Sequence, residues 1–399
     1  MAGRNADQTG ASGPLKVLHV IPSVSRSEGG PSYAVFAFAR AANAAGNETL
    51  IATTGDDETG RNKEIECIFF RRDFQPYKIS FSLRRWLDRH AREFDLVHIH
   101  ALFSFSSRTA AHAAQKQRVP YIVRPLGVLN RWGLANRRPF LKRFWLRFVE
   151  LPILTAAAAI HYTTDAERDE AAMIDPKIAQ LRSFVVPIPV DLQMSDVKGQ
   201  GSEFLQKYPQ AAGKKIVLFL ARLDEKKGLD LLLEAFASAK QEHPDSLLVI
   251  AGDGRARFVR GLHQQAERYG IAEHVLWTGF LGESEKAAAF SAATIYVLPS
   301  YSENFGIAAA EALASGVPTL LSDQVAIARD AANAKAAFVV PARVPELTRA
   351  IGQLLSDPKV REDLGRNAKL AAQRLFSPAR VSDLLVSEYR RILGSNRTA

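Results

Sequence analysis

The stretch that decides the fold spans residues 300–318 and reads Ser300-Tyr-Ser-Glu-Asn-Phe-Gly-Ile-Ala-Ala-Ala-Glu-Ala-Leu-Ala-Ser-Gly-Val-Pro318. A short apolar run, Ile295–Leu298, precedes it and predicts a buried parallel strand. A polar loop carrying Glu303 follows, and then an alanine-rich helix that carries Glu311 and ends at the Gly-Val-Pro. The stretch therefore predicts a strand-to-helix junction with one carboxylate before the helix and one inside it.

Two carboxylates at such a junction cost stability unless something binds there. The free amides at a helix start attract an anion, while the carboxylates of Glu303 and Glu311 accept hydrogen bonds from hydroxyl groups. An anion joined to a polyhydroxylated body matches both preferences. The junction therefore points to a sugar nucleotide as the ligand.

The composition fits a chain of two domains without a membrane span. The 399 residues are too many for one ordinary domain and suit two α/β domains. No window of the sequence supplies the roughly 20 consecutive apolar residues of a spanning helix. Cys67 is the only cysteine, which rules out a disulfide framework within one chain and agrees with a reducing cytoplasm. Residues 1–13 lack the apolar core of a signal peptide, and we expect a disordered leader there.

The net charge of +10 is concentrated in segments that also carry aromatic side chains. Residues 131–148 hold six basic residues and no acidic one, and a helix there would place its apolar side chains on one face. These side chains are Phe140, Leu141, Phe144, Trp145 and Phe148. A basic helix with an aromatic stripe is typical of a segment that binds an anionic membrane surface peripherally. The alternative is a core-facing stripe with a solvated basic back.

A second basic patch covers residues 71–92 and includes Phe74, Tyr77, Phe81 and Trp86. No recognised nucleic-acid-binding motif accompanies either patch, so we expect no nucleic-acid partner. The expected location is the cytoplasm, peripherally on the inner face of the cell membrane if residues 131–148 bind there.

Strand and helix patterns alternate along the chain in two successive sets. The first set has strands predicted at Leu15–Ile21, Thr49–Thr53, Leu96–His100, Tyr121–Arg124, Ala158–Tyr162 and Phe184–Pro187. The second has them at Lys215–Leu220, Leu247–Ala251, Val275–Thr278, Ile295–Leu298, Pro318–Leu321 and Ala337–Val340. This alternation predicts an α/β protein with two Rossmann-like, doubly wound parallel-sheet domains facing across a cleft. We place the N-terminal, acceptor-side domain at residues 14–194 and the C-terminal, donor-nucleotide domain at 195–375. Residues 376–399 are expected to form a helix that packs back on the first domain.

Several predicted strands end in residues that suit phosphate or nucleotide binding. Gly29 and Gly30 follow the first strand just before a helix, where a backbone can approach a phosphate, although a loop that needs positive φ is the commoner reason for such glycines. Arg222 and Lys227 lie on either side of a strand-to-helix turn and can converge on a diphosphate. The small residues of Ala-Gly-Asp-Gly254 leave room for a base, but they lack the spacing of a dinucleotide fingerprint.

These elements together resemble a known family. The segment Arg222–Gly228, then Gly252-Asp-Gly254, then the Glu-x7-Glu element from Glu303 to Glu311, resemble in order and spacing the group 1 glycosyltransferases. This is family 4 of retaining enzymes, which have the two-domain GT-B architecture. Arg124-Pro-Leu-Gly, the basic aromatic helix and the segment 161–167 look like a bacterial subgroup that builds polysaccharides and exopolysaccharides.

The resemblance implies a donor site for a nucleotide-diphosphate sugar. Arg222 and Lys227 would hold the diphosphate, with the amides near Gly29 and Gly30 closing over it from the other domain. Glu303 would hydrogen-bond the donor sugar, and Glu311 would accept bonds from the ribose hydroxyls. The further donor-binding residues implied are Gly252, Asp253, Phe280, Leu281, Asn304, Phe305, Gly306 and Ile307.

The family generally needs no divalent metal, and we expect neither a metal nor a cofactor here. The sequence has no convincing Asp-x-Asp pair, and its one close histidine pair is His98-Ile-His100. We expect these two histidines on alternate faces of their strand, so that at most one points into the cleft. His100 ends the strand and is the candidate catalytic histidine, with a buried structural role as the alternative.

Arg124 is the candidate on the acceptor side. It stands where many relatives have a histidine-glycine pair, and its guanidinium would reach a phosphate or an acidic acceptor, or would only brace the loop. Two further departures are Ile188-Pro-Val-Asp191, where relatives usually show Asn-Gly before Val-Asp, and Ala336-Ala337, which is near a common glycine position.

The resemblance implies transfer of a mannose-like or glucose-like hexose to a hydroxyl of a glycan or lipid-linked acceptor in cell-surface polysaccharide biosynthesis. The acceptor would attack from the front face, and the departing diphosphate would take its proton. Two alternatives remain, a GT-B sugar-nucleotide epimerase and a non-catalytic sugar-nucleotide-binding subunit. The set of Arg222, Lys227, Glu303 and Glu311 favours transfer.

Overall fold

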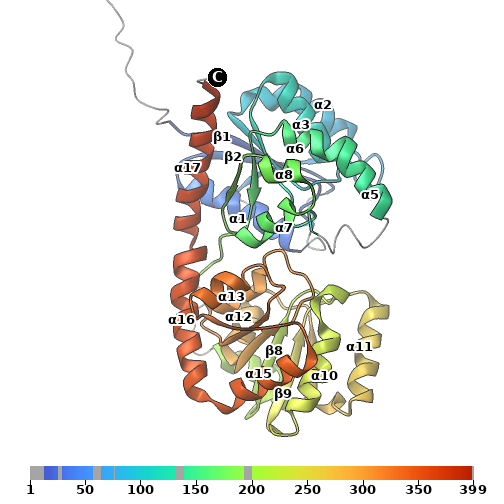
Figure 1. The fold of residues 1–399 in the computed structure, drawn as a ribbon, viewed down its shortest axis with the longest axis vertical. Helices are drawn as coiled ribbons and strands as arrows, with labels where there is room; N and C mark the ends of the chain where they lie inside the picture. The colour runs from blue at the N-terminus through green and yellow to red at the C-terminus, as the bar shows by residue number, and fades with distance from the viewer. Residues whose placement is uncertain are drawn as a thin grey trace, which may run out of the picture. The chain divides into compact units, whose positions relative to one another are not determined.

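The computed structural model describes residues 13–25, 29–56, 64–75, 77–130, 139–192 and 200–397 (Figure 1). The chain divides into two compact units. Unit 1 contains the residues up to Pro189 together with those from Pro378 onward, and unit 2 is Val190–Ser377. Each unit is built on its own parallel sheet, so the predicted α/β class with two doubly wound sheets is confirmed.

The sheet of unit 1 has seven parallel strands in the order β3-β2-β1-β4-β5-β6-β7. The strands are β1 (Lys16–Ile21), β2 (Glu48–Thr54), β3 (Glu66–Phe70), β4 (Leu96–His100), β5 (Tyr121–Arg124), β6 (Ala159–Tyr162) and β7 (Ser183–Val185). The central strands β4, β5 and β6 are buried at every position. Burial on both faces explains why they read as nearly continuous apolar runs in the sequence.

Helices cover both faces of this sheet. They are α1 (Gly30–Ala44), α2 (Phe81–His90), α3 (Phe105–Gln117), α5 (Pro139–Trp145), α6 (Leu151–Thr155), α7 (Asp165–Ala172), α8 (Pro176–Gln180) and α17 (Pro378–Arg397). A π-helical turn, Leu146–Glu150, joins α5 to α6, and a 3₁₀ turn, Ala91–Glu93, follows α2. The last helix, α17, packs beside α1, where the Ser382 hydroxyl donates a hydrogen bond of 2.6 Å to the Ala41 carbonyl.

The sheet of unit 2 has six parallel strands in the order β10-β9-β8-β11-β12-β13. The strands are β8 (Lys215–Leu220), β9 (Ser246–Ala251), β10 (Val275–Gly279), β11 (Ile295–Leu298), β12 (Thr319–Ser322) and β13 (Ala337–Val340). The helices are α9 (Gln200–Lys207), α10 (Leu229–Ala239), α11 (Ala256–Arg268), α12 (Glu283–Ala292), α13 (Ile307–Ala314), α14 (Ala328–Asn333), α15 (Val344–Ser356) and α16 (Pro358–Phe376). Short 3₁₀ turns lie at Pro209–Ala211, Glu225–Lys227 and Ala272–His274.

In both sheets the strand order reverses beside the first strand, between β1 and β4 in unit 1 and between β8 and β11 in unit 2. The connections leave such a switch point in opposite directions, which opens a crevice at the carboxyl ends of the two strands. The loops after β8 and β11 therefore share one edge of the unit 2 sheet. These loops carry the motifs that the sequence singled out.

Sequence patterns did not predict the edge strand β3. Its five residues, Glu-Cys-Ile-Phe-Phe, pair with β2 alone and are only partly buried at most positions. A half-buried edge strand needs no long apolar run, so the pattern that revealed the central strands is missing here. Among the described residues, no helix is long and apolar enough to cross a membrane.

The turn between β8 and α10 depends on a glycine. Gly228 has φ of +68°, and a Cβ there would lie 2.1 Å from the Pro299 carbonyl oxygen at the end of β11. We expect Gly228→Ala to lower the free energy of unfolding by about 3 kcal/mol, from left-handed strain and this clash together.

Gly270 is the matched control, because its φ is +66° but a Cβ there would meet open space. Gly270→Ala should cost only about 1 kcal/mol. Urea unfolding of the full chain measures both variants, and equal losses would contradict the steric role of Gly228.

Candidate functional site

The two loops at the unit 2 switch point bring together a lysine and a glutamate. Lys227 follows β8 and Glu303 follows β11, and the Lys227 Nζ contacts the Glu303 Oε2. Each side chain is only 11% exposed. The backbone fixes the approach of the loops, because the Tyr301 amide donates a hydrogen bond of 2.8 Å to the Lys226 carbonyl. Residues that are 76 positions apart in sequence thus form one charged pair.

The electrostatics at this pair favour an added anion. Burial lowers the pKa of the Lys227 ammonium, and the positive charges of Lys226 and Arg222 lower it further. The Asp224 carboxylate raises this pKa and opposes these effects, and the Glu303 carboxylate contacts the ammonium directly. Arg222 is itself exposed. Three cations therefore lie near two carboxylates, and a phosphate group would relieve the repulsion between the cations.

Helix α13 begins beside this pair with unsatisfied backbone amides. Its N-cap is Gly306, with φ of +89°, which has no side chain to cap the helix. Glu303 lies four residues before the first residue of the helix. Its backbone amide donates a hydrogen bond of 3.0 Å to the Gln324 carbonyl of the neighbouring loop. An uncapped helix start supplies partial positive charge next to Lys227.

Glu311 lies within α13 and is paired with a second lysine. Lys286 on α12 places its Nζ 2.6 Å from the Glu311 Oε1. The Glu311 side chain is 5% exposed and that of Lys286 is 21% exposed. Both carboxylates that the sequence singled out are therefore paired with lysines from other elements. These pairs offset the loss of stability that the two carboxylates would otherwise cause when no ligand is bound.

The other donor-site candidates of unit 2 differ in exposure. Phe305 is buried and stacks edge-on against Phe376, with ring centroids 5.5 Å apart, so only its backbone faces the loop. Phe280 is exposed, whereas Leu281 is buried. Asp253 is exposed, and Asn304 and Ile307 are half-buried.

Gly252 is explained by packing rather than by room for a base. A Cβ on Gly252 would lie 1.9 Å from the Ala221 carbonyl oxygen, and the residue has φ of +139°. The loop after β8 runs directly against it, with the Leu223 amide bonded to the Asp253 carbonyl at 2.8 Å. A donor-binding role for Gly252 thus stays a prediction, since the fold by itself requires the glycine.

In unit 1, Gly29 and Gly30 lie at the start of α1. Gly29 is the N-cap, with φ of +69°, and both glycines are exposed. Gly29 accepts backbone bonds from the amides of Ser32 and Tyr33 at 3.1 and 3.3 Å. The positive φ matches the loop explanation, and a phosphate contact stays a prediction. Residues 26–28, also part of this glycine loop, lie outside the described residues.

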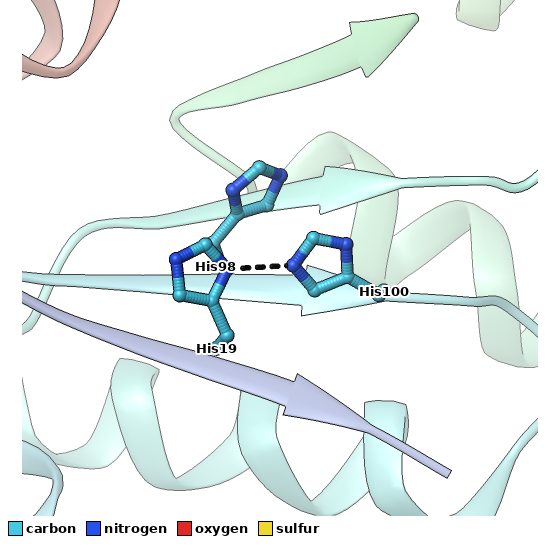
Figure 2. A group of neighbouring side chains, drawn as sticks. All are labelled: His19, His98 and His100. Atoms are coloured by element: carbon cyan, nitrogen blue, oxygen red, sulfur yellow. Dashed lines mark hydrogen bonds between the residues drawn. The ribbon is translucent and has the colours of Figure 1, made fainter. Parts of the chain in front are cut away.

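Buried histidines of unit 1 form a ladder across β1, β4 and β6. His19, His98, His100 and His161 are each 0% exposed and lie on the face of the sheet toward α1 and α17. Figure 2 shows His19 with His98 and His100, and a dashed line marks the bond of 2.8 Å between His19 Nδ1 and His100 Nε2. Stacking supplements the bonds, since the rings of His98 and His100 are centred 4.3 Å apart.

The hydrogen-bond partners fix which ring nitrogens carry protons. A guanidinium only donates, so Arg124 Nη1 donates to His100 Nδ1 at 3.2 Å, and His100 Nε2–H then donates to His19 Nδ1. A carbonyl only accepts, so His161 Nε2–H donates to Val186 O at 2.8 Å. All rings are consequently neutral in this arrangement.

The second chain of the ladder reaches the C-terminal helix. His161 Nδ1 accepts from His98 Nε2–H at 3.2 Å, and His98 Nδ1 accepts from the Tyr389 hydroxyl at 2.8 Å. The Tyr389 side chain comes from α17, so the last helix completes a network that begins in β6.

The predicted alternate faces of His98 and His100 are wrong. Their rings stack, because side chains two positions apart on a strand point to the same face. Both ring nitrogens of His100 are engaged within unit 1. A direct contact of His100 with a donor sugar would therefore require breaking one of these bonds, and its catalytic role stays a prediction.

The three histidines in Figure 2 are close enough to be considered as metal ligands. Their ligating atoms lie within 4.8 Å of one another. However, the contact between His19 and His100 has the length of a hydrogen bond, and the Arg124 guanidinium next to His100 repels a cation. Hydrogen bonding accounts for the cluster, and the metal-free prediction is left as it stands.

Arg124 is buried against the ring of Phe38, with its Cζ 4.9 Å from the ring centroid. Burial lowers the pKa of Arg124 to about 10, while the Glu167 carboxylate opposes that shift. Glu167 also accepts bonds of 2.9 Å from the Gly127 amide and 2.8 Å from the Thr163 amide. This arrangement fits the loop-bracing alternative for Arg124, because the carboxylate ties the ends of β5 and β6 together.

The described part of the basic aromatic segment presents its rings to solvent. Phe144 is 58% exposed, Trp145 39% and Phe148 59%, whereas Leu146 is buried. A π-helical turn follows Trp145, and the rings of Phe144 and Phe148 still lie together, with their centroids 4.7 Å apart. The core-facing alternative is wrong for these three rings. Residues 131–138 lie outside the described residues.

Sequence reasoning missed several residues of these networks. His19 and Tyr389 gave no signal because their partners are distant in sequence, and Lys286 looked like any surface lysine of a helix. Glu167 was detectable, because Thr164 and Glu167 have the spacing of a capping box and the Thr164 hydroxyl accepts from the Glu167 amide.

Two family models match this chain. The model described as "Glycosyl transferases group 1" matches residues 202–371, and the one described as "Glycosyl transferase 4-like domain" matches residues 29–186. The first lies within unit 2 and the second within unit 1.

Sequence relatives and a solved structure agree with these matches. The alpha-D-kanosaminyltransferase of Streptomyces kanamyceticus is 28% identical over 62% of this chain and 64% of its own length. The phosphatidyl-myo-inositol mannosyltransferase of Mycobacterium tuberculosis is 37% identical over 37% of each chain. The structure of Anabaena Alr3699/HepE in complex with UDP and glucose superposes with a TM-score of 0.79, at 18% identity, covering 94% of this chain and 99% of that one.

The histidine ladder makes stability depend on pH. Burial is the largest cause that lowers the pKa of all four histidines, to about 3 for His19 and His161. The unfolded chain, with ordinary values near 6.5, takes up protons first as the pH falls. We expect the free energy of unfolding to fall below pH 6.5, each such histidine contributing about 1.4 kcal/mol per pH unit.

Urea-unfolding midpoints between pH 7.5 and 5 measure this effect. His19→Gln removes one titrating ring and should make the fall less steep. His112→Gln, at an exposed ring on α3, is the control and should leave the slope unchanged. A wild-type midpoint that does not change with pH would contradict a neutral ladder.

Proposed function

Because the chain belongs to the group 1 glycosyltransferases with GT-B architecture, we propose that it transfers a hexose from a nucleotide-diphosphate sugar. The acceptor is a hydroxyl of a glycan or lipid-linked molecule in cell-surface polysaccharide biosynthesis, and the anomeric configuration is retained. The observation that carries the proposal is the buried Lys227–Glu303 pair beside the uncapped start of α13.

Donor binding exchanges the partners of this pair. The diphosphate brings negative charge to Lys227, Arg222 and the amides of α13, which replaces the Glu303 carboxylate as the partner of the lysine. Glu303 is then released to accept hydrogen bonds from the hydroxyls of the donor sugar. The contact between Lys227 and Glu303 holds both side chains in place before the donor arrives.

The same groups stabilise the leaving nucleotide. As the bond between the anomeric carbon and the diphosphate oxygen breaks, Lys227 and Arg222 neutralise the charge that develops on the phosphate. The acceptor hydroxyl attacks from the same face, and its proton passes to the departing phosphate oxygen. The protein supplies charge and orientation, so the step requires no enzyme nucleophile and no metal ion.

The donor sugar is proposed to be mannose-like or glucose-like. The printed name of the mycobacterial relative specifies a mannosyltransferase, and the Anabaena structure contains UDP and glucose. A GT-B sugar-nucleotide epimerase or a non-catalytic sugar-nucleotide-binding subunit would have the same nucleotide-binding site. Formation of a glycan product with release of the nucleoside diphosphate separates transfer from both alternatives.

We expect Lys227→Met and Glu303→Gln each to lower kcat/KM for transfer by about a hundredfold or more, because each removes charge aimed at the reacting donor. The assay incubates a panel of nucleotide sugars with a lipid-linked acceptor and follows nucleotide release and the glycan product.

Lys215→Met is the control, since it breaks an exposed ion pair of unit 2, in which Lys215 Nζ is 3.1 Å from Asp245 Oδ2. Circular dichroism and urea midpoints establish that the variants are folded. Turnover near the wild-type rate in folded Lys227→Met and Glu303→Gln would refute the proposed site.

We also propose peripheral binding of the segment 131–148 to an anionic membrane surface. The exposed rings of Phe144, Trp145 and Phe148 can enter the headgroup region, while the exposed Arg143 and Arg147 pair with lipid phosphates. Cytoplasmic location on the inner face of the membrane would follow from such contact.

Cosedimentation with vesicles tests the membrane contact. The full chain should sediment with anionic vesicles and less so at high salt, because the Debye length shrinks from roughly 10 Å at 0.1 M to 3 Å at 1 M. Phe144→Ser with Phe148→Ser should reduce sedimentation several-fold. Leu370→Ser, at an exposed apolar side chain of α16, should not. Equal sedimentation with neutral and anionic vesicles would contradict the proposal.

A further inference from the structure

Glu311 is a buried carboxylate whose charge is balanced by one lysine. Its side chain is 5% exposed, and its Oε1 lies 2.6 Å from the Nζ of Lys286. The two residues come from different helices, α13 and α12, and are 25 positions apart in sequence. The bond to Lys286 engages Oε1 of this carboxylate and leaves Oε2 out of that contact.

The surroundings place this carboxylate near the carboxyl edge of the unit 2 sheet. The negative charge of Glu311 contributes to the raised pKa of Tyr296, after burial as the larger cause, which puts Glu311 close to that phenol. The Tyr296 hydroxyl in turn donates to the carbonyl of Leu220, the last residue of β8, at 3.2 Å. Glu311 is thus next to the end of the strand that leads to Arg222 and Lys227.

A carboxylate at this position is useful to a nucleotide donor only under two conditions. It must be held in a fixed position in order to accept hydrogen bonds from two adjacent ribose hydroxyls. Its charge must also be balanced, because the donor diphosphate is itself anionic. A lysine at 2.6 Å meets both conditions.

We propose that Lys286 is a positioning residue for the nucleotide ribose. It balances the charge of Glu311 and holds Oε1, so that Oε2 accepts from the ribose hydroxyls. The proposal rests on the proposed function, because it takes a nucleotide as the ligand of this site. It gives Lys286 a role through Glu311 and no contact with the reacting atoms.

The neighbouring residue of the same helix offers a matched control. Glu285 on α12 also pairs with a lysine, Lys207, but these side chains are 39% and 54% exposed. Solvent screens such an exposed pair, so breaking it should change little. Lys207→Met therefore removes a lysine–glutamate pair at α12 without disturbing the Glu311 carboxylate.

The experiment measures binding of UDP and of 2′,3′-dideoxy-UDP to the full chain by calorimetry, with the corresponding pair of guanosine nucleotides used if UDP does not bind. The wild type should prefer the ribose form by about tenfold or more, as hydrogen bonds to a charged acceptor permit. Glu311→Gln and Lys286→Met should both reduce this preference to less than about threefold. Lys286→Arg and Lys207→Met should retain it.

Two further measurements separate positioning from a general loss of structure. The double variant Lys286→Met with Glu311→Gln should discriminate no worse than Glu311→Gln alone, because the lysine acts through the carboxylate. In the transfer assay, Lys286→Met should raise the donor KM while kcat stays within a few-fold. Urea midpoints identify any variant that fails to fold. If Lys286→Met fails to fold, the test is whether Lys286→Arg retains the preference for the ribose form.

The outcomes distinguish the two proposals. If the wild type binds none of these nucleotides, or binds the ribose and dideoxy forms equally, the nucleotide assignment of the proposed function is wrong and this inference falls with it. If Glu311→Gln loses the preference but Lys286→Met keeps it, only the role of Lys286 is overturned.

Discussion

The carboxyl ends of β8 and β11 meet at one edge of a parallel sheet, and that shared edge is the constraint on which the proposed donor site depends. It brings Lys227 and Glu303 into contact across 76 positions of sequence. The approach is close because the backbone of Gly228 passes directly over Pro299. A charged pair in such a crevice is stable alone and can exchange one partner for a phosphate, which is the property that a donor site needs.

In unit 1, by contrast, several polar histidine rings are buried between the sheet and the helices. Its ladder engages all but one of the histidine ring nitrogens in two chains, one that starts at the Arg124 guanidinium and one that ends at the Val186 carbonyl. Tyr389 on the last helix closes the second chain. One ring nitrogen, His19 Nε2, is buried without a partner among the described residues. We expect the ladder to make the stability of this unit sensitive to acid, because burial lowers the pKa of all four histidines.

Much of the fold was predictable because its central strands are buried on both faces and therefore form apolar runs. The edge strand β3 (Glu66–Phe70) was not, since a half-buried edge needs no such run. The candidate residues Lys227, Glu303 and Glu311 were found from their motifs. Their lysine partnerships were not, because Lys286 carries no local signal that distinguishes it from a solvated lysine.

The sequence by itself determined the two parallel sheets, the glycine-bearing turns and the motifs at the strand ends. Hydrophobic periodicity and local backbone conformation depend on residues that are close together in the sequence. Only the tertiary structure decided which charges meet. It paired Glu303 with Lys227 and Glu311 with Lys286, and it engaged both nitrogens of His100 inside unit 1. The physical reason is that ion pairs and hydrogen bonds depend on distances in space, which strand order and register set between residues far apart in the chain.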